Sequence, residues 1–293
     1  MNINDVKKIA VIGSGQMGHQ IAMLAALGGF ETVIQDISES ALTKAEKSLN
    51  GIMNKWVSKG KITEDAVNAA FARLVFSTNL KEAVQDADFI IEAVVEKLEV
   101  KRSVFKELDT WAPKHAILAT NSSTIVNSLI AEVTERPEKM INMHFFFPPL
   151  VMDCVEVVMS SQTSEETAKV TMEVCERMNR TAVLLKKEIS GFIANRILGA
   201  LNKEAIYLYE NGYADYQDID LIVKKALGHP MGPFELMDFS GLDVVYFVQN
   251  QQYQESGNPL ERPAKCLQEK VEKGELGRKT GKGFYTYEKE EVK

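Results

Sequence analysis

The stretch KKIAVIGSGQMGHQIAMLAALGGFETVIQD near the N-terminus constrains the fold of this chain more than any other part of the sequence. A short β-rich run at 8–12 leads into the glycine pattern Gly13-x-Gly15-x-x-Gly18, and apolar residues with helical spacing follow. A second strand-like run then ends at Asp36. This order of strand, glycine turn, helix, strand and acid is typical of a dinucleotide-binding βαβ unit.

Each glycine of this turn has a physical task in such a unit. Gly13 permits the tight turn, Gly15 lets the backbone approach a pyrophosphate, and Gly18 lets the helix pack closely on the strand. The helix N-terminus adds unpaired N–H groups and a positive dipole end. We therefore predict that the loop, with Gln16 and Met17 between its glycines, binds the phosphates of a dinucleotide.

Asp36 lies 21 residues after Gly15, where a ribose-binding carboxylate is expected. An acid at this place favours two free ribose hydroxyls, and hence NAD over NADP. No arginine follows it, since the next residues are Ile37 and Ser38. A methyltransferase can also combine a glycine loop with such an acid, so that class stays open at this point.

The rest of residues 1–188 alternates strand-like and helical patterns. Strands are expected at 74–78, 88–95, 116–121, 141–146 and 153–159, and helices at 38–63, from Thr63, at 80–87, 98–112 and 124–133. Such alternation predicts a Rossmann-like, doubly wound α/β domain with ligands at the carboxyl ends of its strands. Glu96 and Ser123 fall at such ends, although polar residues there often only cap the next helix.

Residues 189–293 lose this alternation and show long helical patterns broken at glycine and proline. We predict an all-α second domain, with an interdomain cleft as the substrate site. Asn195 falls in the first turns of its first helix, where it could reach that cleft. The apolar excess on these helices favours a homodimer formed through this domain.

The stretch MHFFFPPLVMDCVEVV, residues 143–158, is almost entirely apolar but contains His144 and Glu156. Burying such groups is costly unless they satisfy each other. A hairpin centred on Leu150 would place His144 opposite Glu156, and the carboxylate would then fix the imidazole tautomer and raise its basicity. This predicts a general base for alcohol oxidation, with a hydrogen-bonded core histidine as the alternative.

The overall composition limits the remaining classes of partner. A net charge of −7 argues against nucleic acid or an anionic membrane as the main partner. No apolar run approaches the roughly 18–20 residues of a membrane helix, and no targeting peptide precedes the first strand. Three cysteines without a C-x-x-C pattern predict neither disulfides nor a metal site. These features together predict a cytoplasmic protein.

Seven motifs, in order along the chain, make the sequence similar to the 3-hydroxyacyl-CoA dehydrogenases, and in particular to the short 3-hydroxybutyryl-CoA dehydrogenases. The motifs, between about residue 6 and 287, are VIGSGQMG, EAVVEKLEVK, TNSST, MHFFFPPLVMDCVEVV, GFIANRIL, GHPMGPFELMDFSGLD and GRKTGKGFYTY. The resemblance implies reversible oxidation of an (S)-3-hydroxyacyl-CoA to the 3-ketoacyl-CoA with NAD⁺ as acceptor, and a homodimer.

The resemblance also implies roles for individual residues. His144 is the expected catalytic base and Glu156 its partner, while Ser123 and Asn195 are expected to contact the substrate. The expected cofactor residues outside the glycine loop are Asp36, Glu96, Lys101 and Lys279. Lys59 is similar to a position that contacts CoA phosphates, although a solvated lysine is the alternative there.

One residue departs from the family pattern. The family usually has asparagine after HFF, near the nicotinamide, whereas this chain has Phe147. A dehydrogenase of a free hydroxy acid or sugar acid on the same fold therefore stays open as an alternative. A non-catalytic NADH-binding protein is a further alternative, although retention of Ser123, His144, Glu156 and Asn195 argues against it.

Overall fold

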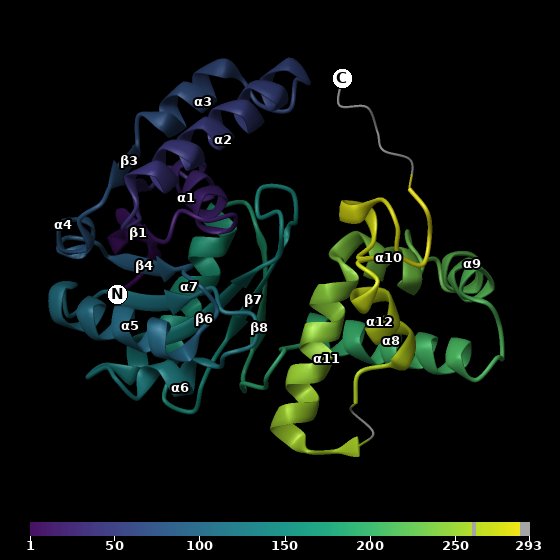
Figure 1. Cartoon of the computed structure of the whole chain (residues 1–293). Helices are drawn as coiled ribbons and strands as arrows, with labels where there is room; N and C mark the ends of the chain where they lie inside the picture. The colour runs from purple at the N-terminus through teal and green to yellow at the C-terminus, as the bar shows by residue number, and fades with distance from the viewer. Residues whose placement is uncertain (260–261, 288–293) are drawn as a thin grey trace. The chain divides into compact units, whose positions relative to one another are not determined.

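The computed structural model describes residues 1–259 and 262–287 (Figure 1). The chain divides into two compact units, of which the first is Met1–Phe192 and the second begins at Ile193. The first unit is an α/β fold and the second is helical, so the predicted fold class is confirmed. Within the described residues, no helix has the length and apolar character needed to cross a membrane.

The first unit contains one eight-stranded sheet with the order β3-β2-β1-β4-β5-β6-β7-β8. The strands are β1 (Lys8–Ile12), β2 (Glu31–Gln35), β3 (Leu74–Ser77), β4 (Phe89–Glu92), β5 (Ile117–Thr120), β6 (Met140–Phe145), β7 (Cys154–Val158) and β8 (Thr181–Leu185). Neighbouring strands are parallel except β6 and β7, which are antiparallel. The strand order reverses between β1 and β4, which is the usual ligand position in doubly wound sheets.

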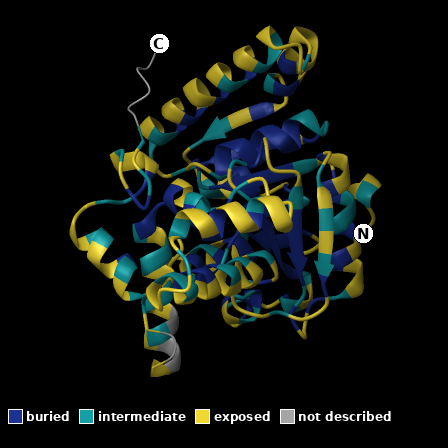
Figure 2. Cartoon of the chain, turned by 90° about the vertical axis from the view of Figure 1, so that its right-hand side faces the viewer, coloured by how far each residue is buried: buried dark blue, intermediate teal, exposed yellow. Residues whose placement is uncertain are grey.

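Helices cover both faces of this sheet because alternate residues of each strand point to opposite sides. Ile9 and Val11 join a core with one set of helices, and Ala10 and Ile12 join a core with the other. The first set is α1 (Gly18–Leu27), α2 (Glu39–Ser58), α3 (Glu64–Phe71) and α7 (Glu165–Arg177), and the second is α4 (Leu80–Val84), α5 (Leu98–Trp111) and α6 (Asn127–Ala131). In Figure 2 the helices carry exposed and buried stripes around a buried sheet.

Several helices begin where the sequence predicts a start. Ser38 and Thr63 are the N-cap residues of α2 and α3, and each side chain accepts a hydrogen bond from a first-turn N–H. Such caps satisfy backbone donors that have no partner inside the helix. The cap at Ser38 fixes the start of α2 two residues after Asp36.

The described part of the second unit contains α8 (Ala194–Glu210), α9 (Tyr216–Ala226), α10 (Pro233–Ser240), α11 (Leu242–Ser256) and α12 (Lys265–Glu272), followed by the 3-10 helix η4 (Arg278–Thr280). Its core contains a cluster of aromatic rings from Tyr209, Tyr216, Phe234 and Phe284. Gly241, with a φ of 99°, separates α10 from α11, as expected for a glycine in the left-handed region.

Several elements are shorter than the sequence predicts, and others were not predicted. α2 ends at Ser58 rather than at residue 63, and α4 ends at Val84 rather than at residue 87. β4 ends at Glu92 rather than at residue 95, since the chain turns where the Glu92 carboxylate accepts the Val94 N–H. α6 begins at Asn127 rather than at residue 124. The N–H groups of Ser123 and Thr124 instead donate to the Glu96 carboxylate. The elements α7, β8 and α12 were not predicted.

Candidate active site

The predicted site residues of the first unit gather at one edge of the sheet. Because β1, β2, β4, β5 and β6 run parallel, their carboxyl ends lie at the same edge. The residues at this edge are Gly13, Gly15, Gln16, Met17 and Gly18 after β1, Asp36 after β2, Glu96 after β4, Ser123 after β5, and His144 near the end of β6. The edge therefore combines a glycine loop, carboxylates and an imidazole.

The three glycines of the loop differ in how much space their surroundings leave for a side chain. Gly13 has a φ of 100°, and a Cβ there would lie 2.7 Å from the carbonyl oxygen of Ala93. A Cβ at Gly18 would lie 1.8 Å from the carbonyl oxygen of Gly13, so this glycine is needed within the loop itself as well as for close helix packing. At Gly15 a Cβ would meet nothing within 4 Å. Gly15 is thus the position with open space for a ligand.

Asp36 lies beside this loop because β1 and β2 are adjacent strands. Its Oδ2 accepts hydrogen bonds from the backbone N–H and the hydroxyl of Ser14, both at 2.9 Å, and its Oδ1 accepts the Ser38 N–H at 3.0 Å. The Asp36 carboxylate is therefore held at the end of β2, next to the glycine loop that is predicted to bind phosphates. Open space at Gly15 together with this acid fits an NAD molecule with free ribose hydroxyls.

Glu96 organises the loop that follows β5. Its Oε1 accepts the Ser122 hydroxyl at 2.5 Å and the N–H groups of Ser123 and Thr124 at 3.0 Å each. Burial alone would raise the pKa of Glu96, but the Lys101 ammonium and these hydrogen bonds hold it below its usual value. Glu96 is therefore ionised at neutral pH and anchors the loop that carries Ser123.

Lys101, on α5, is buried, with a relative exposure of 1%. Its ammonium lies 2.8 Å from Oε1 of Glu92 and 3.3 Å from Oε2 of Glu96. Glu92, which is fully buried at the end of β4, was not among the predicted site residues. A charged residue at the end of the apolar run FII, residues 89–91, is the signal that could have identified it.

His144 and Glu156 face each other across the antiparallel pair β6–β7, as the hairpin register predicts. Nδ1 of His144 lies 2.9 Å from Oε2 of Glu156. Both side chains are buried, and the imidazole packs against the rings of Phe146 and Phe192, with centroids at 4.7 and 5.4 Å. A carboxylate at Nδ1 selects the tautomer with its proton on Nδ1, so that Nε2 is the nitrogen able to accept a proton.

Asn121 connects this pair to the loop after β5. Its side-chain oxygen accepts the backbone N–H of Phe145 at 2.9 Å, directly after His144. The loop that carries Ser123 is thereby attached to the strand that carries the imidazole. Ser123 itself is half-buried, and its N–H contributes to the Glu96 cluster.

The other predicted residues lie apart from this edge or in the second unit. Lys59 is exposed just after α2. Asn195 is exposed in the first turn of α8, and the ammonium of Lys279 pairs with Asp243 at 2.5 Å. Asn195 and Lys279 belong to the second unit, and their contacts with substrate or cofactor stay predictions.

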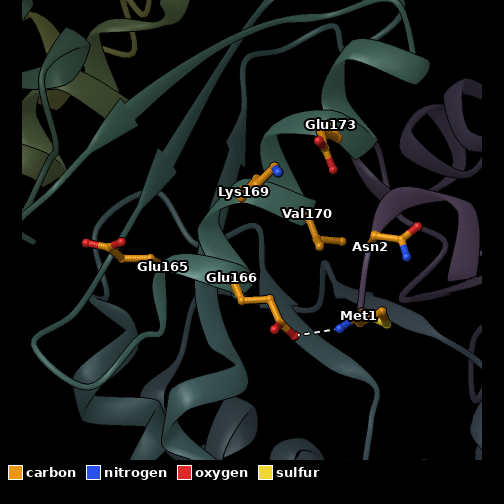
Figure 3. Close-up of a pocket in the computed structure, with 7 residues that line it drawn as sticks. All are labelled: Met1, Asn2, Glu165, Glu166, Lys169, Val170 and Glu173. Atoms are coloured by element: carbon orange, nitrogen blue, oxygen red, sulfur yellow. Dashed lines mark hydrogen bonds and ion pairs between the residues drawn. The ribbon is translucent and has the colours of Figure 1, made fainter.

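Two further observations concern a pocket of the first unit and the distribution of side chains that could bind a metal ion. A pocket is lined by Met1, Asn2, Glu165, Glu166, Lys169, Val170 and Glu173, and it contains none of the predicted site residues (Figure 3). The N-terminal amine pairs there with Glu166 at 2.7 Å. Nowhere in residues 1–259 and 262–287 do three or more His, Cys, Asp or Glu side chains gather as a metal ion would require.

Comparison with known families identifies both parts of the chain. Residues 8–189 match the family model of the NAD binding domain of 3-hydroxyacyl-CoA dehydrogenase, and residues 191–287 match that of its C-terminal domain. A probable 3-hydroxybutyryl-CoA dehydrogenase of Bacillus subtilis is 40% identical over 284 residues, covering 97% of this chain and 98% of the relative.

Solved structures give the same assignment. The (S)-3-hydroxybutyryl-CoA dehydrogenase of Ralstonia eutropha aligns with a TM-score of 0.90 and 34% identity, covering 97% of this chain and all of that chain (100%). A diketoreductase that acts on dicarbonyl compounds aligns with a TM-score of 0.87 and 33% identity, covering 96% and 99%. These dehydrogenase matches leave no support for a methyltransferase. The chain therefore belongs to the 3-hydroxyacyl-CoA dehydrogenase family and is an NAD-dependent oxidoreductase.

Proposed function

We propose that this chain oxidises (S)-3-hydroxyacyl-CoA, of the 3-hydroxybutanoyl-CoA type, to 3-ketoacyl-CoA, with His144 as the general base. Bound NAD⁺ supplies the acceptor for the hydride that leaves the substrate carbon. Nε2 of His144 takes the hydroxyl proton as the carbonyl forms, and Glu156 stabilises the resulting imidazolium. In the reverse direction the imidazolium returns this proton to the alkoxide oxygen.

The observation that carries the proposal is the 2.9 Å contact between Nδ1 of His144 and Oε2 of Glu156, at the sheet edge that also holds the glycine loop. A buried imidazole–carboxylate pair needs no such loop for stability. The loop needs no such pair to bind phosphates. Their presence at one edge supports a reaction that combines a hydride acceptor with a proton acceptor.

The remaining roles follow from family membership and chemistry. We propose that Ser123 and Asn195 donate hydrogen bonds to the substrate oxygen, and that Lys59 contacts the CoA phosphates. Glu96, Lys101 and Lys279 are proposed to act near the cofactor, with Lys101 acting through Glu96. A homodimer formed through the helical unit and a cytoplasmic location also stay proposals.

The deciding assay follows NADH oxidation at neutral pH with acetoacetyl-CoA, beside free acetoacetate, a longer 3-ketoacyl-CoA and NADPH. We expect turnover with the CoA thioesters and NADH. Absence of CoA-dependent turnover, with NADH still bound, would contradict the proposed substrate class. The absence of any turnover with bound NADH would instead favour the non-catalytic alternative.

The role of His144 is tested by His144→Gln. We expect kcat to fall by about 10²–10⁴-fold with NADH binding retained, because this is the usual contribution of a general base. His115→Gln is the matched control: His115 is exposed and pairs with Asp88 before β5, at the amino ends of the strands. A His144→Gln enzyme with kcat within a few-fold of wild type would rule out the base.

A second candidate is a dehydrogenase of a free hydroxy acid or sugar acid on the same fold, or a reductase of a dicarbonyl compound. Two observations favour keeping it: the likeness to the diketoreductase, and Phe147, which is 58% exposed just after β6. The free acetoacetate arm of the assay separates this candidate from the first. If that arm is the faster one, Phe147→Asn is the first variant to test.

A further inference from the structure

Glu92 is a fully buried carboxylate at the carboxyl end of β4. Its Oε1 accepts the Val94 N–H at 2.7 Å, and its Oε2 accepts the Thr120 hydroxyl at 2.7 Å. Both oxygens also contact the ammonium of Lys101, at 2.8 and 3.1 Å. The backbone and Thr120 therefore fix this carboxylate, and the carboxylate in turn fixes the ammonium.

The position of Lys101 depends on Glu92 because a buried ammonium needs a carboxylate partner. Glu92 provides the two shortest contacts, and Glu96 provides a longer one at 3.3 Å. The Glu96 side chain is 38% exposed, whereas those of Glu92 and Lys101 are buried. The rigid part of the cluster is thus the Glu92–Lys101 pair, and Glu96 is the member that reaches the surface.

Glu96 connects the Glu92–Lys101 pair to the loop after β5. While Oε2 of Glu96 faces Lys101, Oε1 accepts hydrogen bonds from Ser122, Ser123 and Thr124. One carboxylate oxygen of Glu96 thus contacts Lys101 and the other contacts the loop. We therefore expect a displacement of the Lys101 ammonium to reorient the Glu96 carboxylate and, with it, the loop. Ser123 is the residue on that loop with a proposed substrate contact.

We propose that Glu92 is a positioning residue: it fixes Lys101, and through Lys101 it orients Glu96 and the Ser122–Thr124 loop for the reaction. The part of this inference that concerns the reaction rests on the proposed function. The part that concerns order in the loop does not depend on it. Glu92 itself makes no contact with substrate in this scheme.

A double-mutant cycle tests the path through Glu96. The variants are Glu92→Gln, Glu96→Gln and the combination, with kcat/KM for acetoacetyl-CoA and NADH as the readout. We expect Glu92→Gln to lower kcat/KM about tenfold in the wild type and less than about twofold when Glu96 is already changed. Equal losses in both backgrounds would overturn the path, because a merely structural effect would be additive.

Hydrogen exchange of the Ser123 and Thr124 amides gives a second readout that needs no activity. We expect Glu92→Gln to speed this exchange about tenfold, since the acceptor on Glu96 is displaced. Glu99→Gln is the matched control, with the same chemical change at an exposed position of α5. Unchanged exchange in Glu92→Gln would refute the proposal, even if activity fell.

The role of Glu92 can still be tested if the wild-type chain is inactive with acetoacetyl-CoA, or if Glu92→Gln does not fold. If the wild-type chain does not turn over acetoacetyl-CoA, the proposed function fails, and the exchange measurement still decides the role of Glu92. If Glu92→Gln does not fold, Glu92→Asp replaces it, because this variant keeps the charge but withdraws the carboxylate from the Lys101 ammonium by one methylene group. We then expect faster exchange of the same amides by a smaller factor, and unchanged exchange would again refute the proposal.

Discussion

The side-chain oxygen of Asn121 accepts the backbone N–H of Phe145 at 2.9 Å, and both residues are buried. This bond joins the loop after β5 to the end of β6, immediately beyond His144. It is a contact between two parts of the edge that the sequence separates by 24 residues. The Asn121 side chain thus helps to hold the loop and the imidazole in one arrangement.

Asn121→Ala should therefore reduce both stability and activity. The Phe145 N–H would be left buried without its acceptor, which costs about 1–3 kcal/mol in the free energy of unfolding. We also expect a fall in kcat with NADH affinity nearly unchanged, since the glycine loop is not touched. Urea unfolding and steady-state kinetics measure the two effects. Asn50→Ala, an exposed change on α2, should alter stability by less than about 0.5 kcal/mol.

Asp36 should determine the choice between NADH and NADPH. Asp36→Ala removes the acceptor proposed for the ribose hydroxyls, so we expect kcat/KM for NADH to fall about tenfold or more. NADPH should become relatively better, because a negative charge no longer faces its phosphate. Asp36→Asn is the comparison, since it removes the charge at the same size. An unchanged ratio of the two kcat/KM values in both variants would contradict this role.

Asp238 should stabilise the second unit by holding the segment after η4. Its Oδ1 accepts the Phe284 N–H at 2.9 Å, and its Oδ2 accepts the Tyr285 N–H at 2.9 Å and the Tyr287 hydroxyl at 3.0 Å. Burial and the Asp238 carboxylate raise the pKa of Tyr287, so its hydroxyl stays protonated as a donor. A Cβ at Gly283 would lie 2.0 Å from Oδ1, so the glycine is required there.

Asp238→Ala should accordingly lower the free energy of unfolding by about 3 kcal/mol, because the buried Phe284 N–H and the partly buried Tyr285 N–H lose a charged acceptor. Tyr287→Phe removes only one hydrogen bond and should cost about 1 kcal/mol. Asp218→Ala, at an exposed position in the first turn of α9, is the control and should cost less than about 1 kcal/mol. Equal effects of Asp238→Ala and Asp218→Ala on thermal unfolding would contradict the assignment.

Acid should weaken the first unit partly through Asp109. Burial alone would raise the pKa of Asp109, but the Arg136 guanidinium at 2.7 Å and the Glu135 N–H hold it below its usual value. A carboxyl whose pKa is lower in the folded state stabilises the fold above its unfolded value, about 3.9, and loses this contribution as the pH falls through the folded value. Stability should therefore decline progressively below about pH 4.

The contribution of Asp109 is measured by urea unfolding of the wild type and Asp109→Asn between pH 7 and pH 2.5. We expect the variant to be less stable at neutral pH, and the difference to shrink below about pH 4 as the wild-type carboxyl is protonated. A difference that stays constant over this range would show that the ion pair with Arg136 does not carry the effect.

Much of the fold was predictable because local signals agree with the tertiary structure. The first βαβ unit combines strand, glycine turn, helix and strand within 36 residues, and Ser38 and Thr63 place two helix starts. The lengths of β4 and α6 were not predictable by pattern, because apolar residues continue after the end of β4 and also precede the start of α6. At the end of β4 the Glu92 carboxylate takes the Val94 N–H, which a longer strand could have used in the sheet. Before α6 the Glu96 carboxylate accepts the Ser123 and Thr124 N–H groups, so these residues form a turn around it.

The site was predictable to different extents for its different parts. A hairpin assumed to be centred on Leu150 predicted His144 opposite Glu156, and the structure has this register. The Glu92–Lys101 pair was not found, since its partners come from β4 and α5 and no spacing rule relates a strand end to a helix face. The contact between Asn121 and Phe145 depends in the same way on strands that become neighbours only in the sheet.

The antiparallel pairing of β6 and β7 has a consequence for how this sequence can change. Side chains alternate between the two faces of a strand, so a slip of one residue in the pairing would turn Glu156 away from His144 and move its apolar neighbours on β7 to the opposite face as well. Replacements in the turn between the strands can therefore be tolerated where an insertion that shifts the pairing cannot. In natural variation of this segment, its length should be inherited more strictly than its composition.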